Sequence, residues 1–224
     1  MARDNSAAER QRKQLERKLG HRASYDRVLI VCEGSKSEPN YFKDIRAAYR
    51  LQTANVEVQP SRFGTGPIQV VQYARSLFES GDRYKQIQPR AFEQIYVVFD
   101  RDDHQTYFDA LKLAEELDGK LRNDNKQPVR FKAITSVPCF ELWLLLHYED
   151  VQAVIHRDEV MQRLKGYLSG YEKGMSSGFA LTRERLAIAT LRAQTLSEKH
   201  SAYSVPEPFT AIHELVTLLT TLRG

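Results

Sequence analysis

The sequence predicts an α/β fold: an open, mostly parallel sheet flanked by helices, with a helical C-terminal region. Short apolar runs, many of them β-branched, alternate along the chain with longer segments whose apolar residues recur every three or four positions. This alternation is typical of strands that are joined by helices. After residue 140 the pattern is almost entirely helical. The second half of the chain is therefore expected to add helices to a sheet formed by the first.

Four strands are predicted, over residues 27–32, 55–59, 94–100 and 129–135. The third is the clearest, because Gln94 to Asp100 is a nearly continuous apolar run that ends in acids, as in the centre of a parallel sheet. Three helices are expected between or after these strands, over residues 38–49, 68–78 and 106–117. The C-terminal helices are expected over residues 140–148, 155–170, 182–196 and 209–222.

A chain of 224 residues, 42% of them apolar, can bury a core, so one main globular unit is expected. We divide it into an N-terminal arm (1–26), helical or flexible, a central core (27–150) and a helical region packed on that core (151–224). No apolar run is long enough to cross a bilayer. Cys32 and Cys139 lie in apolar stretches, where free thiols behave as small hydrophobes. These features favour a protein of the reducing cytoplasm with no membrane association.

The net charge of +4 originates in the first 27 residues, which contain eight lysines and arginines and four acids. A basic arm of this kind can follow a phosphate backbone by releasing counterions. It is also typical of a solvated tail. Both interpretations remain open on the sequence alone.

Acids follow two of the predicted strands. Glu33 ends the first strand, and Asp100 ends the third. Ligands of open parallel sheets bind beyond the carboxyl ends of the strands, so these side chains are expected to share one crevice. Asp102 would project to the same side as Asp100 if the chain stayed extended. Such carboxylates suit Mg²⁺, which keeps several waters and takes few protein ligands.

An Asp-x-Asp sequence after a strand is common, so the acids alone do not prove a site. Three buried acids without a cation would repel one another, so either a metal binds or the cluster is open to water. Glu141 begins a predicted helix, where it either joins the acids or interacts with the helix dipole. His104 is a weaker candidate in the loop after the acids, and His147 is expected to pack in the core.

Two sets of residues resemble known families. Val28 to Gly34, the Gly64-Thr65-Gly66 loop and Phe99 to Asp102 resemble the Toprim catalytic core of topoisomerases, primases and OLD-type nucleases. The resemblance to the RloB family is closer and extends from Val28 to the C-terminus. It rests on Cys32 to Phe42, Asp100-Arg101-Asp102 and Ser136 to His147, with a weaker similarity at 208–210. The sequence departs from that pattern at Val137, where an asparagine is expected.

The resemblance implies a Toprim-like core with a metal site. In it Glu33 is a ligand or general acid/base, Asp100 and Asp102 hold Mg²⁺ or Mn²⁺, and Glu141 is a further catalytic candidate. The implied activity is a metal-dependent nuclease that hydrolyses DNA or RNA, tRNA included. The candidate contacts to the nucleic acid are Gly34, Lys36, Arg101 and Lys173.

The implied role is an anti-phage effector that causes abortive infection, with an ATPase partner and a homo-oligomeric state among its expected associations. The alternative is a non-catalytic subunit of an ATPase-containing defence complex that binds nucleic acid or regulates its partner. A topoisomerase or primase would need further modules, which makes this class the least favoured.

Overall fold

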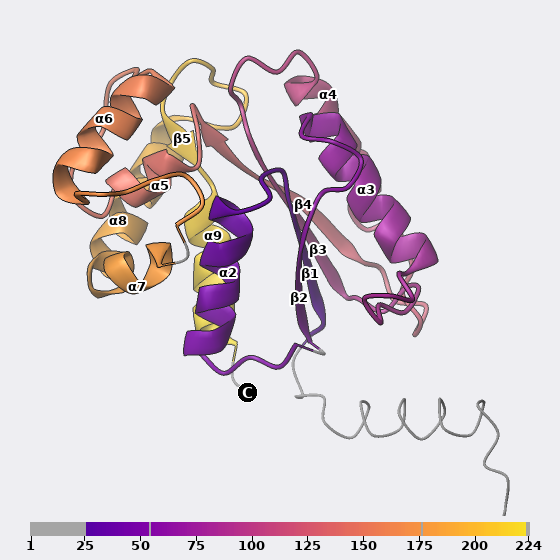
Figure 1. Cartoon of the computed structure of the whole chain (residues 1–224). Coiled ribbons are helices and arrows are strands. Elements are labelled where there is room, and N and C mark those ends of the chain that lie inside the picture. The colour runs from indigo at the N-terminus through magenta and orange to yellow at the C-terminus, as the bar shows by residue number, and fades with distance from the viewer. Residues whose placement is uncertain (1–25, 54, 176, 223–224) are drawn as a thin grey trace, which may run out of the picture.

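The predicted α/β fold is confirmed by the computed structural model, which describes residues 26–53, 55–175 and 177–222. The sheet has five strands in the order β2-β1-β3-β4-β5 (Figure 1). The strands are β1 (Val28–Cys32), β2 (Val56–Pro60), β3 (Gln94–Asp100), β4 (Arg130–Val137) and β5 (Phe209–Thr210). The first four are parallel, and the short β5 pairs antiparallel with β4. All four predicted strands are therefore present.

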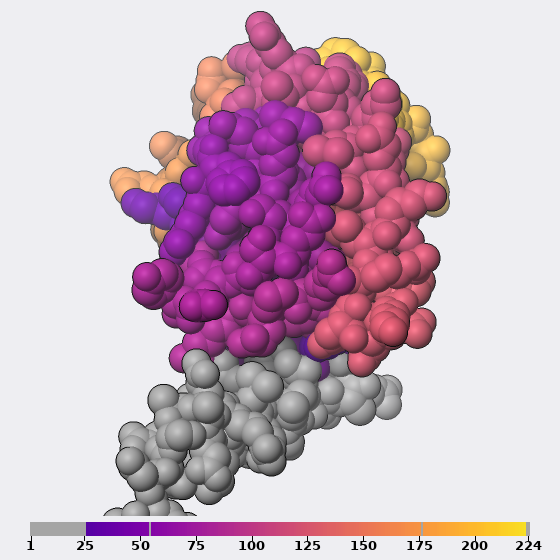
Figure 2. Space-filling model, turned by 90° about the vertical axis from the view of Figure 1, so that its right-hand side faces the viewer, coloured from indigo at the N-terminus to yellow at the C-terminus, as the bar shows by residue number. Residues whose placement is uncertain are grey.

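Helices cover both faces of the sheet. The α-helices are α2 (Ser37–Ala48), α3 (Pro67–Ser80), α4 (Tyr107–Leu117), α5 (Glu141–Leu145), α6 (Arg157–Tyr167), α7 (Gly178–Thr182), α8 (Leu186–Lys199) and α9 (Ile212–Thr221), with a 3-10 turn, η1 (Arg183–Arg185). Figure 1 shows α3 and α4 on one face and α2 and α9 on the other. Figure 2 shows the molecule from the α3 and α4 side. The helices α5 to α8 pack beyond α2.

The strand order creates a crevice between β1 and β3. From β1 the chain passes through α2 to β2 on one side, and then returns through α3 to β3 on the other side of β1. At such a switch point the connections diverge and leave space at the carboxyl ends of the strands. Cys32 lies opposite Val98, and the Glu33 amide donates to the Val98 carbonyl at 2.8 Å. The first acid therefore lies directly beside the end of β3.

The packing explains why these segments form their elements. Every residue of β1 is buried, which matches its unbroken apolar sequence. One face of α2 is buried through Tyr41, Phe42 and Ile45, at the predicted spacing. The buried Trp143 indole donates to the Tyr41 hydroxyl at 2.8 Å, so both polar groups are satisfied inside the core. This bond joins the C-terminal helices to α2.

The prediction of one helix over 209–222 was wrong at its start. Phe209 and Thr210 form β5, and α9 begins only at Ile212. The Thr210 hydroxyl lies 2.9 Å from the Ser136 hydroxyl, and Phe209 pairs with Val137. Tertiary pairing with the edge of β4 thus prevails over local propensity. The predicted helix over 182–196 likewise spans the end of α7, η1 and most of α8.

Arg27, the last of the eight basic residues counted in the first 27, lies at the start of the predicted strand over 27–32. Its side chain is buried and binds both Glu93 and Asp124. These contacts raise the pKa of Arg27, chiefly through its hydrogen bonds to Asp124 and Glu93. Arg27 therefore anchors the start of β1 rather than contributing to a free cationic segment. The predicted arm itself lies outside the described residues, except for Asp26.

Both cysteines are free and buried, as predicted. Burial is the main cause that raises the pKa of each thiol. No helix of the described segments combines the length and apolarity that a membrane span requires.

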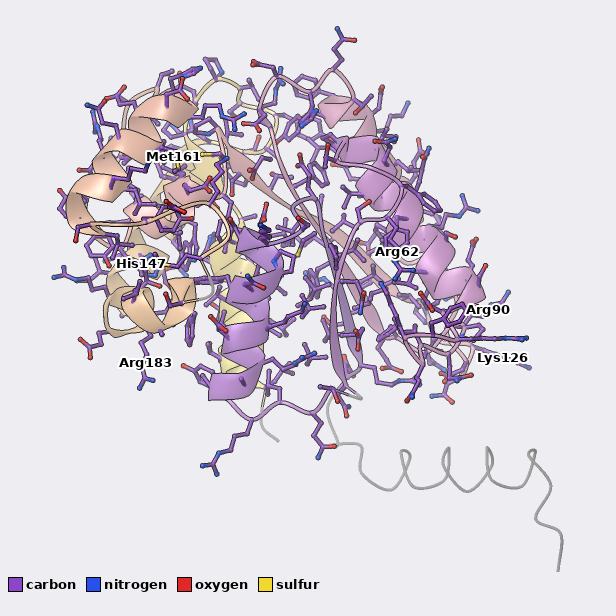
Figure 3. All side chains as sticks on the ribbon, in the orientation of Figure 1. Arg62, Arg90, Lys126, His147, Met161 and Arg183 are labelled. Atoms are coloured by element: carbon purple, nitrogen blue, oxygen red, sulfur yellow. The ribbon has the colours of Figure 1, made fainter. Side chains whose placement is uncertain are left out.

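His147 packs in the core as expected and makes stability sensitive to acid. Figure 3 places it among the C-terminal helices, where it is fully buried against Trp143. Burial lowers the pKa of His147 to about 4, from 6.5. The unfolded chain therefore binds the proton first as pH falls, and stability is lost from pH 6.5 down to pH 4. We expect this loss to reach about 3 kcal/mol from His147.

Urea unfolding at several pH values tests this prediction. His147→Gln should flatten the pH dependence of the free energy of unfolding between pH 6.5 and 4. His156→Gln is the control, because His156 is largely exposed. An equally steep dependence in His147→Gln would show that His147 is not the titrating group.

Candidate active site

A cavity of about 270 Å³ opens at the carboxyl ends of β1 and β3. It is lined by Glu33, Gly34, Ser35, Lys36, Ser37, Glu38, Thr65, Asp100, Asp102, Glu141, Lys173 and Gly174. Five of these residues are acids, and they come from three separate parts of the chain. The structure thus brings together all four predicted catalytic acids and adds Glu38.

Glu33 is held by groups from the end of β3 and the loop that follows. Its Oε2 accepts a hydrogen bond from the Asp100 amide at 2.9 Å, and its Oε1 lies 3.0 Å from His104 Nε2. Burial raises the pKa of Glu33, against the opposing effects of these two contacts. The side chain remains 11% exposed, so water can reach it. His104, the weaker candidate, therefore touches the site through Glu33.

Asp100 is the most deeply placed acid of the β3 end. It is 8% exposed, and burial raises the pKa of its carboxyl well above the usual range. The carboxylates of Glu38, Glu141 and Glu33 act in the same direction. Such mutual repulsion destabilises the charged cluster unless a cation compensates it.

Asp102 reaches the cavity by a different route from the one predicted. The expected extended chain is wrong, because β3 ends at Asp100 and Asp102 has a φ of +31°. Its amide donates to the Pro138 carbonyl at 3.2 Å, which supports the turn. A turned backbone, rather than strand alternation, thus directs Asp102 into the same cavity.

Glu38 was missed by the sequence analysis, which treated it only as part of a helix and a motif. It lies in the first turn of α2 and is buried. Burial raises its pKa to about 7, with further contributions from Glu141 and Glu33. A signal was available, because Pro39 marks the first turn and so places Glu38 close to the end of β1. Glu141, at the start of α5, is 2% exposed and completes the set.

Gly34 is needed for the position of Glu38. A Cβ atom at Gly34 would lie 2.2 Å from Glu38 Oε2, so any side chain would displace that carboxylate. Gly34→Ala should therefore weaken divalent-cation affinity at least about tenfold, with little change in thermal stability. Calorimetric titration with Mn²⁺ and thermal unfolding measure the two effects.

Gly166→Ala is the matched control for this prediction, because a Cβ there meets no atom within 4 Å. It should leave cation affinity unchanged. Equal cation affinities in Gly34→Ala and wild type would contradict the role assigned to Gly34.

Two lysines lie at the rim of the acid-lined cavity. Lys36 is the N-cap residue of α2, and Lys173 Nζ lies 3.8 Å from Glu141 Oε2. Their loops are joined, because the Gly174 amide donates to Ser37 Oγ at 2.9 Å. The Lys36 side chain also packs on Gly174, which has a φ of +93° and no room for a Cβ. The C-terminal region therefore contributes directly to the cavity.

Arg101, the other predicted cationic contact, is held by groups outside the cavity. Its guanidinium lies over the rings of Tyr107 and Phe108 and donates to the carbonyl of Asp102 at 2.7 Å. It is not among the residues that line the cavity. Arg157, which the sequence analysis did not consider, instead forms an ion pair with Asp102 at 2.8 Å.

The side chains present fit a hard divalent cation. All five acidic side chains offer oxygen ligands, and the cavity leaves room for the waters that Mg²⁺ retains. Asp102 Oδ1 is buried, and no described residue gives it a hydrogen bond. Within the described segments, no three His, Cys, Asp or Glu side chains form a group that could hold a metal ion as they stand. A cation in this cavity would therefore take few protein ligands and keep several waters.

The comparison with protein families decides the identity of the chain. The family model described as RloB-like protein matches residues 28–219. The chain belongs to the RloB-like family. Every residue that lines the acid-lined cavity lies within the matched segment of this RloB-like chain. No curated protein and no solved structure matches it.

Proposed function

We propose that this RloB-like chain is a nuclease that hydrolyses phosphodiester bonds of DNA or RNA with the help of Mg²⁺ or Mn²⁺. One observation carries the proposal: five carboxylates from three segments meet at the switch point of the sheet, beneath two lysines. An acidic floor suits a metal ion, and a cationic rim suits a phosphate. The resemblance of Glu33, Asp100 and Asp102 to the Toprim motif supports the same conclusion.

In this proposal the acids hold the cation. Glu33, Asp100 and Asp102 are the first ligands to test, and Glu38 and Glu141 are near enough to ligate or to orient a bound water. The bound cation supplies charge neutralisation at the phosphate and lowers the pKa of the attacking water. No covalent intermediate with the protein is required.

Proton transfer is assigned to Glu33. Burial raises its pKa, so it is a better proton acceptor than an exposed glutamate. The adjacent His104 is about one-third exposed and links Glu33 to solvent. Lys36 and Lys173 bind phosphate oxygens, and Gly34 lets the backbone approach the substrate closely.

The biological setting rests on the resemblance alone. It is an anti-phage effector in the cytoplasm that acts in abortive infection, with an ATPase partner and self-association among its interactions. In the alternative the chain is a nucleic-acid-binding or regulatory subunit without catalysis. The nuclease and the non-catalytic subunit, or adaptor, predict different responses to metal. The adaptor needs no cation to bind nucleic acid, whereas the nuclease needs one to cut it.

The test is cleavage of supercoiled DNA, single-stranded DNA, bulk RNA and tRNA by the purified full chain. Each substrate is incubated in Mg²⁺, in Mn²⁺ and in EDTA. The proposal expects at least one substrate to be cut in a divalent cation and none in EDTA. Nucleic-acid binding that is the same in EDTA and in metal, without any cleavage, would support the adaptor instead.

A further inference from the structure

The two oxygens of Asp102 have different surroundings. Oδ2 lies 2.8 Å from Arg157 Nη1, whereas Oδ1 is buried without a hydrogen bond from any described residue. The φ of +31° at Asp102 is one that residues other than glycine rarely adopt. The turn therefore holds one oxygen ready for a ligand while Arg157 neutralises the other.

Arg157 is well placed to change partners. It is the first residue of α6, and its side chain is 36% exposed. A guanidinium has five N–H donors, and Asp102 is its only ion-pair partner within the described part of the chain. An ion pair with this exposure is weak, so little is lost when it breaks.

A bound divalent cation would weaken this pair further, because it compensates the charge of Asp102. Arg157 is not itself among the residues that line the cavity and reaches it only through Asp102. A guanidinium released from Asp102 would lie next to the place that the proposed function gives to the cation and the phosphate. Arginine binds phosphate through two parallel N–H donors, a geometry that lysine cannot reproduce. Arg157 can thus pair with Asp102 when the cavity is empty and with a phosphate when a cation is bound.

We propose that Arg157 exchanges Asp102 for a phosphate of the nucleic acid when a divalent cation enters the cavity. This inference rests on the proposed function and identifies a phosphate-binding residue of that site. Arg157 opposes binding of the cation alone but favours binding of cation and nucleic acid together. The two ligands therefore bind cooperatively.

Arg157→Gln should change the two affinities in opposite directions. Without nucleic acid, Mn²⁺ should bind about two- to fivefold more tightly, because its competitor for Asp102 is gone. With Ca²⁺ present, a labelled single-stranded oligonucleotide should bind at least about tenfold more weakly. The slope of log affinity against log salt concentration should fall in magnitude by about 0.7, the value for one lost phosphate contact.

The experiment uses the full chain, with calorimetry for Mn²⁺ and fluorescence anisotropy for the oligonucleotide at several salt concentrations. Arg163→Gln is the matched control, because Arg163 lies on the same helix and pairs with Glu149 and Glu159. It should leave both affinities and the slope unchanged. Arg157→Lys should keep the salt slope, since it retains the charge, and should recover part of the affinity.

Parallel losses of Mn²⁺ and oligonucleotide affinity in Arg157→Gln would overturn the inference, because they would mean that Arg157 only positions Asp102. Unchanged affinities would overturn it as well. If Arg157→Gln does not fold, an Arg157→Lys variant that loses the salt slope is the overturning result. None of these measurements requires cleavage. If the wild type binds Mn²⁺ and the oligonucleotide but does not cut, the proposed nuclease activity is refuted while the inference about Arg157 is still tested by the binding data.

Discussion

Asp100→Asn is expected to abolish cation binding and nucleic-acid cleavage while the protein remains folded. Asp100 is buried at the end of β3 among three other carboxylates, so its charge is tolerable chiefly when a cation is bound. Loss of a ligand at this position should lower the cleavage rate by about 10³-fold or more. In EDTA the variant should be at least as stable as wild type, because a buried charge has been removed.

Calorimetric titration with Mn²⁺ and thermal unfolding in EDTA separate these effects from misfolding. Asp103→Asn is the control, since Asp103 is close in sequence, exposed and outside the cavity lining. It should bind Mn²⁺ and cut as wild type does. Wild-type Mn²⁺ affinity in Asp100→Asn would contradict the assignment of Asp100 as a ligand.

Glu38→Gln is expected to stabilise the metal-free protein at alkaline pH. The pKa of Glu38 is about 7 in the folded chain against an ordinary glutamate value of 4.5, so the folded state holds the proton more tightly. The stability that this proton provides is complete below pH 4.5 and is lost as pH rises through 7. At pH 8 the variant should therefore be more stable in EDTA by up to about 3 kcal/mol.

Urea unfolding at pH 4.5 and at pH 8 measures this difference. The two proteins should be nearly equal at the lower pH and should separate at the higher one. In Mg²⁺ the advantage of Glu38→Gln should shrink, because the cation stabilises the wild-type cluster. Glu116→Gln, an exposed position on α4, should show no such pattern. Equal stabilities of Glu38→Gln and wild type at pH 8 in EDTA would contradict the claim that the charged Glu38 carboxylate destabilises the metal-free protein.

The sequence was sufficient for the four parallel strands of the sheet and for the acids at its edge, but not for β5. Continuous apolar runs predicted β1 and β3, and the rule for parallel sheets placed Glu33 and Asp100 in one crevice. Both inferences depend on short-range patterns and on a general property of α/β topology. The cavity observed at the β1/β3 switch point lies where that rule places it.

The remaining parts of the site depend on contacts between distant segments. Arg157 follows Asp102 by 55 positions. Lys173 was named as a candidate contact, but its place at the rim, next to the bond from Gly174 to Ser37, was not predicted. No local pattern encodes such contacts. Glu38 was missed for a different reason, because an acid in a first helical turn is more often a partner of the helix dipole.

The central claim, a metal-dependent nuclease built on the acid-lined cavity, is tested most directly by one comparison. Wild type and Asp100→Asn are assayed side by side on the same labelled DNA and RNA substrates in Mn²⁺, with EDTA as the blank. We predict cleavage by wild type in Mn²⁺ and none by Asp100→Asn. Cleavage by the variant at the wild-type rate, or by wild type in EDTA, would contradict the account.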